Sequence, residues 1–310
     1  MRHHLPGRAL LALFLPVLAL TACSSADPTR DTTSGAVPSG GSTEATTVVV
    51  GSQAYYSNEI IAEIFAQALE GADLTVTREY QIGQREVYMP ELESGAIDVM
   101  PEYTGNLLQY YDSSATSGTP EEVAQALADA LPEGLHALPF AQATDQDSFT
   151  VTRAFAQEHG LKTLADLASV GTPLRIAANS EFETRPYGPQ GLKSAYGIDV
   201  ELVPVEDSGG PLTVKALTDG TVQLADIYSS DPAITANDLV TLEDPESLVL
   251  PQNVVPIVSP RLTERAKEAL GRVTDALTTQ DLIALNTRSV AEQKTSAEIA
   301  GAWLEQKGLD

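Results

Sequence analysis

Cysteine and histidine are scarce in this chain, and their scarcity excludes several kinds of chemistry. The 310 residues include one cysteine and four histidines. A single cysteine forms no intrachain disulfide and cannot build a cysteine-rich metal site. Outside the N-terminal leader, His136 and His159 have no partner at the spacing of a metal-binding pair or of a nucleophile and its base. Phosphate-binding and dinucleotide-binding glycine motifs are also missing, so we expect a protein that is not an enzyme and holds no metal or cofactor.

Positive charge is also scarce. The chain has 18 Lys+Arg against 43 Asp+Glu, which gives a formal net charge of −25. Such a surface repels nucleic-acid phosphates and anionic lipid, so the sequence predicts no nucleic-acid partner. Two interpretations of the acidic residues remain open. They form a solvated surface without a ligand, or they draw a cationic ligand toward a cleft.

The sequence has no apolar run that is long enough to span a membrane. The run over residues 9–20 is short of the roughly 20 apolar residues that a spanning helix needs. A basic tip precedes it and small residues follow it, which is the pattern of an export signal over residues 1–22. The signal ends in Leu-Thr-Ala-Cys, which is similar to a bacterial lipobox. The sequence therefore predicts that Cys23 is lipidated and anchors the chain on the extracytoplasmic face of the cell membrane. The alternative is an ordinary secretory signal with an unrelated cysteine.

The segment after the signal differs in composition from the rest of the chain. Residues 23–47 contain almost no large apolar side chains and are rich in Ser, Thr, Gly and Pro. Such a segment buries too little surface to fold, so it is predicted to be a flexible tether. The roughly 260 residues that follow exceed what one hydrophobic core usually serves. The sequence therefore predicts two lobes.

Short apolar strands alternate with amphipathic helices in both halves of the chain, which predicts an α/β fold. The expected strands are residues 48–50, 74–77, 96–100, 174–178, 200–205 and 222–228. The expected helices are residues 60–71, 85–94, 120–131, 190–196, 211–217, 262–277, 280–287 and 296–307.

Two extended segments are candidates for the connections between lobes. They are residues 148–153 and 253–258. They divide the chain into lobe 1, residues 48–150 plus 256–310, and lobe 2, residues 151–255. Two α/β lobes joined by two crossings on an exported chain predict a clamshell like the type II periplasmic binding proteins. Its ligand would lie between the lobes, where closure buries it.

Several motifs carry a resemblance to a known family. Residues 51–52 read Gly-Ser and residues 101–105 read Pro-Glu-Tyr-Thr-Gly, while residues 182–188 and 225–231 read Phe-Glu-Thr-Arg-Pro-Tyr-Gly and Ala-Asp-Ile-Tyr-Ser-Ser-Asp. Over residues 48–309, this order resembles the osmoprotectant-binding proteins of ABC importers, which take glycine betaine, choline, carnitine or proline betaine. The resemblance implies that the protein passes its solute to a membrane permease. Because this chain has no ATP-binding motif, we expect the ATPase to be a separate chain, and we expect the protein to be a monomer.

Aromatic residues suit a quaternary-ammonium ligand. Such a cation donates no strong hydrogen bond, so its site uses aromatic faces that each contribute roughly 0.5–2 kcal/mol. The resemblance implies that Tyr103 and Tyr228 form this aromatic cage, one from each lobe, and Tyr55 and Phe149 are further candidates. The alternative for Tyr103 and Tyr228 is an ordinary role in the core or in turns. The tyrosines expected to lie on the surface or to pack are Tyr56, Tyr88, Tyr110, Tyr111 and Tyr187.

A betaine also carries a carboxylate, which calls for a cation that forms two hydrogen bonds. Arg185 occupies the arginine position of the family, and its alternative role is an ion pair with a surface acid. Thr104 and Asn106 could add hydrogen bonds to the ligand. Asp145 or Asp147 could orient a tyrosine hydroxyl or meet the cation.

Two positions depart from the betaine-binding pattern. Gln53 stands where some relatives have a lysine, and Val214 stands where some have a tyrosine of the cage. We include Gln53 in the expected site. Without the lysine and the tyrosine of those relatives, the identity of the ligand stays open among glycine betaine, choline, carnitine and another small solute. The second hypothesis is a lipid-anchored clamshell that senses or scavenges a different solute without delivering it to a permease.

Overall fold

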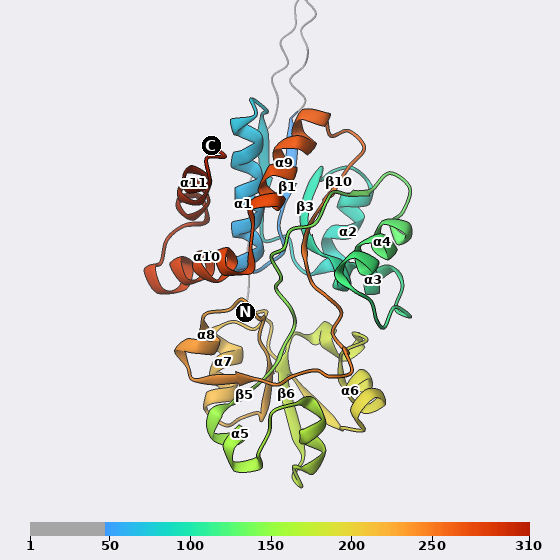
Figure 1. The fold of residues 1–310 in the computed structure, drawn as a ribbon, viewed down its shortest axis with the longest axis vertical. Helices are drawn as coiled ribbons and strands as arrows, with labels where there is room; N and C mark the ends of the chain where they lie inside the picture. The colour runs from blue at the N-terminus through green and yellow to red at the C-terminus, as the bar shows by residue number, and fades with distance from the viewer. Residues whose placement is uncertain (1–46) are drawn as a thin grey trace, which may run out of the picture. The chain divides into compact units, whose positions relative to one another are not determined.

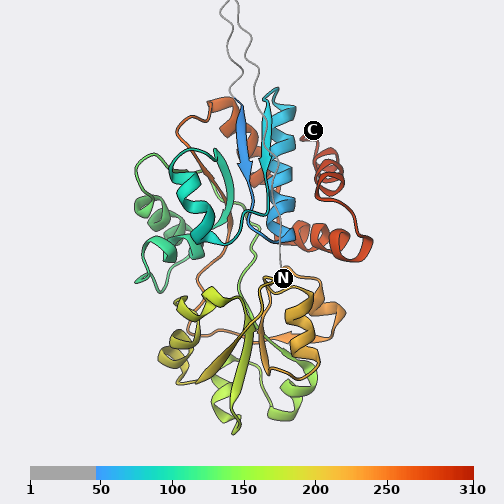
Figure 2. The same cartoon turned by 180° about the vertical axis from the view of Figure 1, so that it is seen from behind.

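The computed structural model describes residues 47–310. The predicted signal peptide, the predicted lipidation site at Cys23 and nearly all of the predicted tether lie outside the described residues. Among residues 47–310, no helix combines the length and the apolar character needed to cross a bilayer. Figures 1 and 2 show two groups of helices, each arranged around its own β-sheet.

The first sheet has five strands in the order β2-β1-β3-β10-β4. β1 (Val48–Gly51) pairs in parallel with β2 (Val76–Glu79) and β3 (Val99–Tyr103). β10 (Val254–Val258) returns antiparallel to β3, and β4 (His136–Ala137) pairs antiparallel on its other side. The parallel strands are joined by helices, as the alternating sequence pattern requires.

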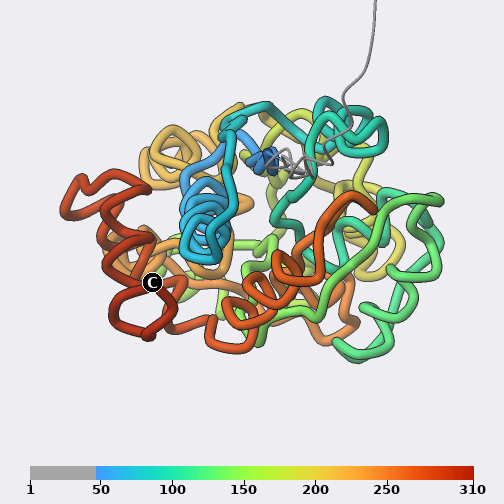
Figure 3. The backbone as a smooth tube through the Cα atoms, turned by 90° about the horizontal axis from the view of Figure 1, so that it is seen from above, coloured from blue at the N-terminus to red at the C-terminus, as the bar shows by residue number. Residues whose placement is uncertain are grey.

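Helices cover both faces of the first sheet. They are α1 (Tyr56–Gly71), α2 (Arg85–Glu93), α3 (Thr104–Tyr111), α4 (Pro120–Ala130), α9 (Glu264–Ala276), α10 (Thr279–Glu292) and α11 (Ser296–Lys307). Val48 and Val50 pack into a core shared with α1, α9, α10 and α11, whereas Val49 packs with α2, α3 and α4. Successive strand residues point to opposite faces, so a strand that is apolar throughout serves both cores. Figure 3 shows the C-terminal helices beside α1.

The second sheet also has five strands, in the order β7-β6-β8-β5-β9. β6 (Leu174–Ala178) pairs in parallel with β7 (Val200–Pro204) and β8 (Leu224–Asp226). β5 (Phe149–Thr152) lies antiparallel between β8 and β9 (Leu239–Thr241). Both sheets are therefore mixed, with parallel strands at one side and an antiparallel strand that enters from the other lobe.

Short helices cover the second sheet. They are α5 (Arg153–His159), η1 (Leu164–Ser169), η2 (Ser180–Thr184), α6 (Pro189–Tyr196), α7 (Pro211–Thr218) and α8 (Ala233–Ala236). α7 and α8 pack on one face, and the others pack on the opposite face. The two-lobe α/β architecture that the sequence predicts is confirmed.

The chain passes between the two sheets just before β5 and just before β10, and the two crossings lie side by side (Figure 1). An antiparallel bridge between Thr144 and Asn253 links them. The sequence predicts crossings within residues 148–153 and 253–258, but those extended segments are the paired strands themselves. We therefore propose lobe limits slightly earlier than predicted, near residues 148 and 253.

Two strand ends differ from the sequence prediction in a way that affects the site. The strand predicted at residues 96–100 lies instead at β3, so Tyr103 is its last residue. β8 ends before Tyr228, which therefore lies in the following loop. The sequence also missed α3 and α5, each of which begins directly at the end of a strand.

Candidate functional site

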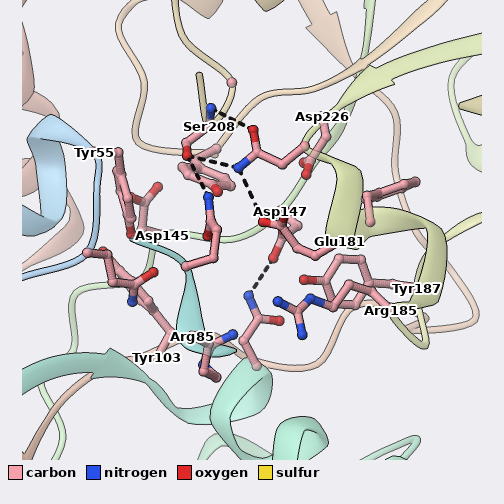
Figure 4. Close-up of a pocket in the computed structure, with 17 residues that line it drawn as sticks. Tyr55, Arg85, Tyr103, Asp145, Asp147, Glu181, Arg185, Tyr187, Ser208 and Asp226 are labelled. Carbon is pink, nitrogen blue, oxygen red and sulfur yellow. Dashed lines mark hydrogen bonds between the residues drawn. The ribbon is translucent and has the colours of Figure 1, made fainter. Parts of the chain in front are cut away.

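A cavity lies between residues of the two lobes and the crossing segment (Figure 4). The space between its lining residues measures about 550 Å³, counting the part that is open to solvent. The predicted site residues that line it are Gln53, Tyr55, Tyr103, Asn106, Asp145, Asp147, Arg185 and Tyr228. The structure thus brings together side chains that are far apart in the sequence.

Thr104 and Phe149 do not line this cavity. Thr104 is buried at the start of α3, where its hydroxyl donates to the Pro251 carbonyl at 2.9 Å and accepts from the Asn253 amide at 3.1 Å. Phe149 is buried in the core of the second lobe, with its ring 6.1 Å from that of Phe182. Thr104 therefore fixes a crossing segment, and Phe149 stabilises the second lobe.

Tyrosines from both lobes face the cavity. The rings of Tyr55, just before α1, and Tyr228, just after β8, lie 5.1 Å apart between centroids, tilted by 60°. Tyr103 is 3 % exposed and lines the same cavity. Tyr187, which we expected to pack or lie on the surface, is also a lining residue, and its ring packs edge-on against Phe182. Four tyrosines from the two lobes therefore line the cavity.

Four carboxyl groups line the cavity, and burial raises the pKa of three of them. Burial raises the pKa of Asp145 to about 7. Burial, followed by the charge of the neighbouring Asp147, raises the pKa of Asp226 well above its usual range. Burial also raises the pKa of Glu181. A cation in the cavity would favour the ionised form of each group.

The two arginines of the cavity are held in ion pairs. Arg85 Nε and Nη2 each donate to the Glu102 carboxylate at 2.8 Å, and both side chains are buried. Arg185 Nη1 donates to Glu86 Oε1 at 2.9 Å. Because Arg185 follows η2 and Glu86 belongs to α2, this second pair joins the two lobes.

Two buried polar atoms of the cavity have no hydrogen-bond partner within the described part of the chain. They are Gln53 Nε2 and Tyr103 Oη. A buried donor without an acceptor costs free energy, so unpaired atoms of this kind indicate a place for a ligand or water.

The remaining predicted positions lie outside the cavity. Val214 is buried in α7, so its departure from the betaine-binding pattern removes no aromatic face from the residues that line this site. Tyr56 donates from its hydroxyl to Asp231 Oδ2 at 2.7 Å, which links α1 to the second lobe. No cluster of three or more metal-ligating side chains occurs among residues 47–310.

The sequence analysis did not place several lining residues in the site. They are Gln84, Arg85, Asn179, Glu181, Phe182, Tyr187, Ser208, Gly209 and Asp226. Tyr187 and Asp226 lie in segments that carry the family resemblance, so their motif positions were a usable signal. Their residue types alone did not separate a ligand contact from a packing role.

Titration of Asp145 is expected to make the ligand-free protein less stable as the pH rises. The usual pKa of 3.8 applies to the unfolded chain, whereas the folded pKa is about 7. Between these pH values the unfolded chain loses a proton that the folded protein keeps. The stability of the folded protein therefore falls from about pH 4 to about pH 7. Thermal melting across this range measures the fall.

Asp145→Asn is the matched control for this pH dependence. The asparagine keeps an acceptor oxygen for the Ser230 amide, which lies 3.0 Å from Asp145 Oδ1. A carboxyl group whose pKa is lowered in the folded protein, such as Glu63, stabilises the fold at neutral pH and loses this stabilisation only below the usual pKa of 4.5. Such groups therefore do not hide the fall in stability between about pH 4 and about pH 7. An identical pH slope in the parent protein and in Asp145→Asn contradicts the assignment to this carboxyl group.

Comparison with known proteins gives a family match over most of the chain. Residues 46–306 match the family described as the substrate binding domain of ABC-type glycine betaine transport systems. The chain is 27 % identical over 288 residues to the glycine betaine-binding protein YehZ of Escherichia coli (strain K12), covering 85 % of this chain and 92 % of that protein. It is 25 % identical over 290 residues to a glycine-betaine-binding protein of Pseudomonas aeruginosa, covering 87 % of this chain and 90 % of that protein.

Solved structures share the fold. A crystal structure of a glycine betaine/carnitine/choline ABC transporter protein matches with a TM-score of 0.69 at 22 % identity, covering 84 % of this chain and 99 % of that chain. Lactococcal OpuAC in its closed form with glycine betaine matches with a TM-score of 0.61 at 18 % identity, covering 85 % of this chain and 98 % of that chain. At these identities the likeness concerns the fold.

Proposed function

This chain belongs to the family of substrate-binding domains of ABC-type glycine betaine transport systems, and from this premise we propose that it captures a small ammonium osmolyte in the cavity between its lobes. Members of this family are solute-binding proteins rather than enzymes. The captured solute is delivered to a membrane permease that is driven by a separate ATPase chain.

The observation that carries this proposal is the pairing of Tyr55 and Tyr228 across the two lobes beside buried carboxyl groups. Ring faces and carboxylates both attract a cation, and neither requires it to donate a hydrogen bond. Because Tyr55 and Tyr228 come from different lobes, one cation contacts both rings only when the lobes are closed. The binding named for the relatives in Escherichia coli and Pseudomonas aeruginosa supports the same ligand class.

We also propose where in the cell this protein lies. The leader pattern before Cys23 supports export followed by lipid anchoring on the extracytoplasmic face. Mass spectrometry of the mature N-terminus tests this, because an unmodified N-terminus contradicts the anchor. We also propose that the chain acts as a monomer.

Calorimetric titration of the purified protein tests the binding function. The ligands are glycine betaine, carnitine, proline betaine and choline, with proline and glutamate as controls. We expect micromolar binding of at least one quaternary ammonium and no binding of the controls. No binding across the whole panel contradicts the ligand class and favours a clamshell that serves another solute.

The role of Arg185 as a carboxylate clamp is tested by releasing it from its ion pair. A ligand carboxylate would have to displace Glu86, whose Oε1 lies 2.9 Å from Arg185 Nη1. We therefore expect Glu86→Gln to strengthen the binding of glycine betaine and carnitine severalfold and to leave choline unchanged. A change of equal size for all ligands indicates an effect on lobe closure and contradicts the clamp.

A further inference from the structure

Both guanidinium groups of the cavity are already paired with protein carboxylates. Arg85 binds the fully buried Glu102 through two hydrogen bonds of 2.8 Å. Arg185 binds Glu86 through Nη1 at 2.9 Å. Among the described residues that line the cavity there is no lysine. A ligand carboxylate that enters the cavity therefore meets no unpaired positive charge there.

Four carboxyl groups of the cavity have no positively charged side chain paired with them. They are Asp145, Asp147, Glu181 and Asp226. Within residues 47–310, none of the four forms an ion pair. Asp147 Oδ2 accepts from Asn106 Nδ2 at 2.7 Å, and Asp226 Oδ1 accepts from the Ser148 amide at 3.1 Å. Since a carboxylate can accept about four hydrogen bonds, both groups keep capacity for a donor on a ligand.

Asp147 belongs to the segment just before β5, and Asp226 is the last residue of β8. Figure 4 shows the two side chains near each other. Burial, followed by the charge of Asp147, raises the pKa of Asp226. A zwitterion adds a third negative group beside this pair, whereas a cation reduces the repulsion within it.

The unpaired Gln53 Nε2 is an independent observation about the ligand. Gln53 is 6 % exposed and lines the same cavity, and its amide nitrogen lacks an acceptor within the described residues. An amide nitrogen only donates hydrogen bonds, so its partner must carry an acceptor oxygen. A ligand hydroxyl and a ligand carboxylate both offer such an oxygen, but only the hydroxyl also donates a hydrogen bond to the carboxyl groups of the cavity.

Building on the proposed function, we propose that this cavity selects a hydroxylated ammonium cation without a carboxylate. The positive charge offsets the unpaired carboxyl groups and lies against the tyrosine rings. The ligand hydroxyl donates to the pair formed by Asp147 and Asp226, and a ligand oxygen gives Gln53 Nε2 its acceptor. Zwitterionic betaines bind less tightly because their carboxylate has no unpaired cation to meet.

Titration calorimetry with three related probes tests this selection. Choline carries the charge and a hydroxyl, tetramethylammonium carries only the charge, and glycine betaine carries the charge and a carboxylate. A hydrogen bond to a charged group is stronger than one between neutral groups, so we expect choline to bind at least about tenfold more tightly than either other probe. Glycine betaine as the tightest ligand overturns the inference and leaves the proposed function standing. No binding of any probe contradicts both.

Asp226→Asn then tests the carboxylate itself, because the amide keeps the shape of the side chain and removes its charge. We expect choline to bind at least about tenfold more weakly to this variant, with glycine betaine unchanged or tighter. Asp129→Asn, at an exposed position of α4, is the matched control and should change neither affinity. If Asp226→Asn does not fold, Asp147→Asn carries the same expectation. Equal losses for choline and glycine betaine in these variants overturn the inference.

Discussion

Tyr228→Ala is expected to weaken the binding of a quaternary ammonium at least about tenfold while the fold is retained. The ring lies 5.1 Å from that of Tyr55 and belongs to a loop after β8, so its removal opens one wall of the cavity. A desolvated cation–aromatic contact contributes up to about 2 kcal/mol, and tenfold corresponds to about 1.4 kcal/mol. Calorimetric titration measures the affinity, and thermal melting checks the fold.

Tyr103→Ala should cause a loss of affinity of at least the same size. Tyr103 also packs into the core of the first lobe, so Tyr103→Phe is needed beside it. The phenylalanine keeps the aromatic face and removes only a hydroxyl without a partner among the described residues. Tyr110→Ala, outside the cavity, is the control for loss of an aromatic ring. Affinities that stay unchanged in both Tyr103→Ala and Tyr228→Ala would remove the basis for the aromatic cage.

Arg85→Ala is expected to lower the free energy of unfolding by about 3–5 kcal/mol, because it leaves a buried carboxylate without its cation. Glu102 is fully buried, and its remaining donors are the Tyr88 hydroxyl and the Tyr103 amide, which lies 2.9 Å from Oε2. Chemical denaturation of the ligand-free protein measures the loss. The effect should reach the ligand site as well, since the same carboxylate holds the backbone of Tyr103.

Arg265→Ala is the matched control for this ion pair. Arg265 pairs with Asp73 on the surface, and both side chains are more than half exposed. Exposed pairs contribute little to stability, so we expect the free energy of unfolding to stay nearly unchanged in this variant. A loss in Arg85→Ala that is no larger than the loss in Arg265→Ala contradicts a structural role for the buried pair.

Local patterns were sufficient to predict most of the fold. The predicted limits of β6 and α11 match the structure. β6 is a run of buried apolar residues interrupted only by Arg175, and α11 begins at a capping box formed by Thr295 and Glu298. α3 was missed because its start lacks a capping side chain and is stabilised by contacts with the segment before β10. A Cβ atom at Gly105 would lie only 2.6 Å from Leu250 Cβ, a close approach that the sequence does not reveal.

The candidate site was predictable in part, for a different reason. Tyr103, Tyr228 and Arg185 lie in motifs whose order resembles a known family, and the structure brings all three to one cavity. The resemblance did not reveal that Arg185 is paired with Glu86 or that Asp226 interacts with Asp147. Both interactions join segments that are far apart in the sequence, and they depend on how the two lobes pack against each other.

The most direct test of the account is a crystal structure of the protein grown with choline. The account predicts the ammonium group among the rings of Tyr55, Tyr103 and Tyr228, with the ligand hydroxyl within hydrogen-bond distance of Asp147 or Asp226. Residues of both lobes would then contact one ligand. A ligand bound elsewhere on the protein, or one that contacts a single lobe and none of these tyrosines, would contradict the account.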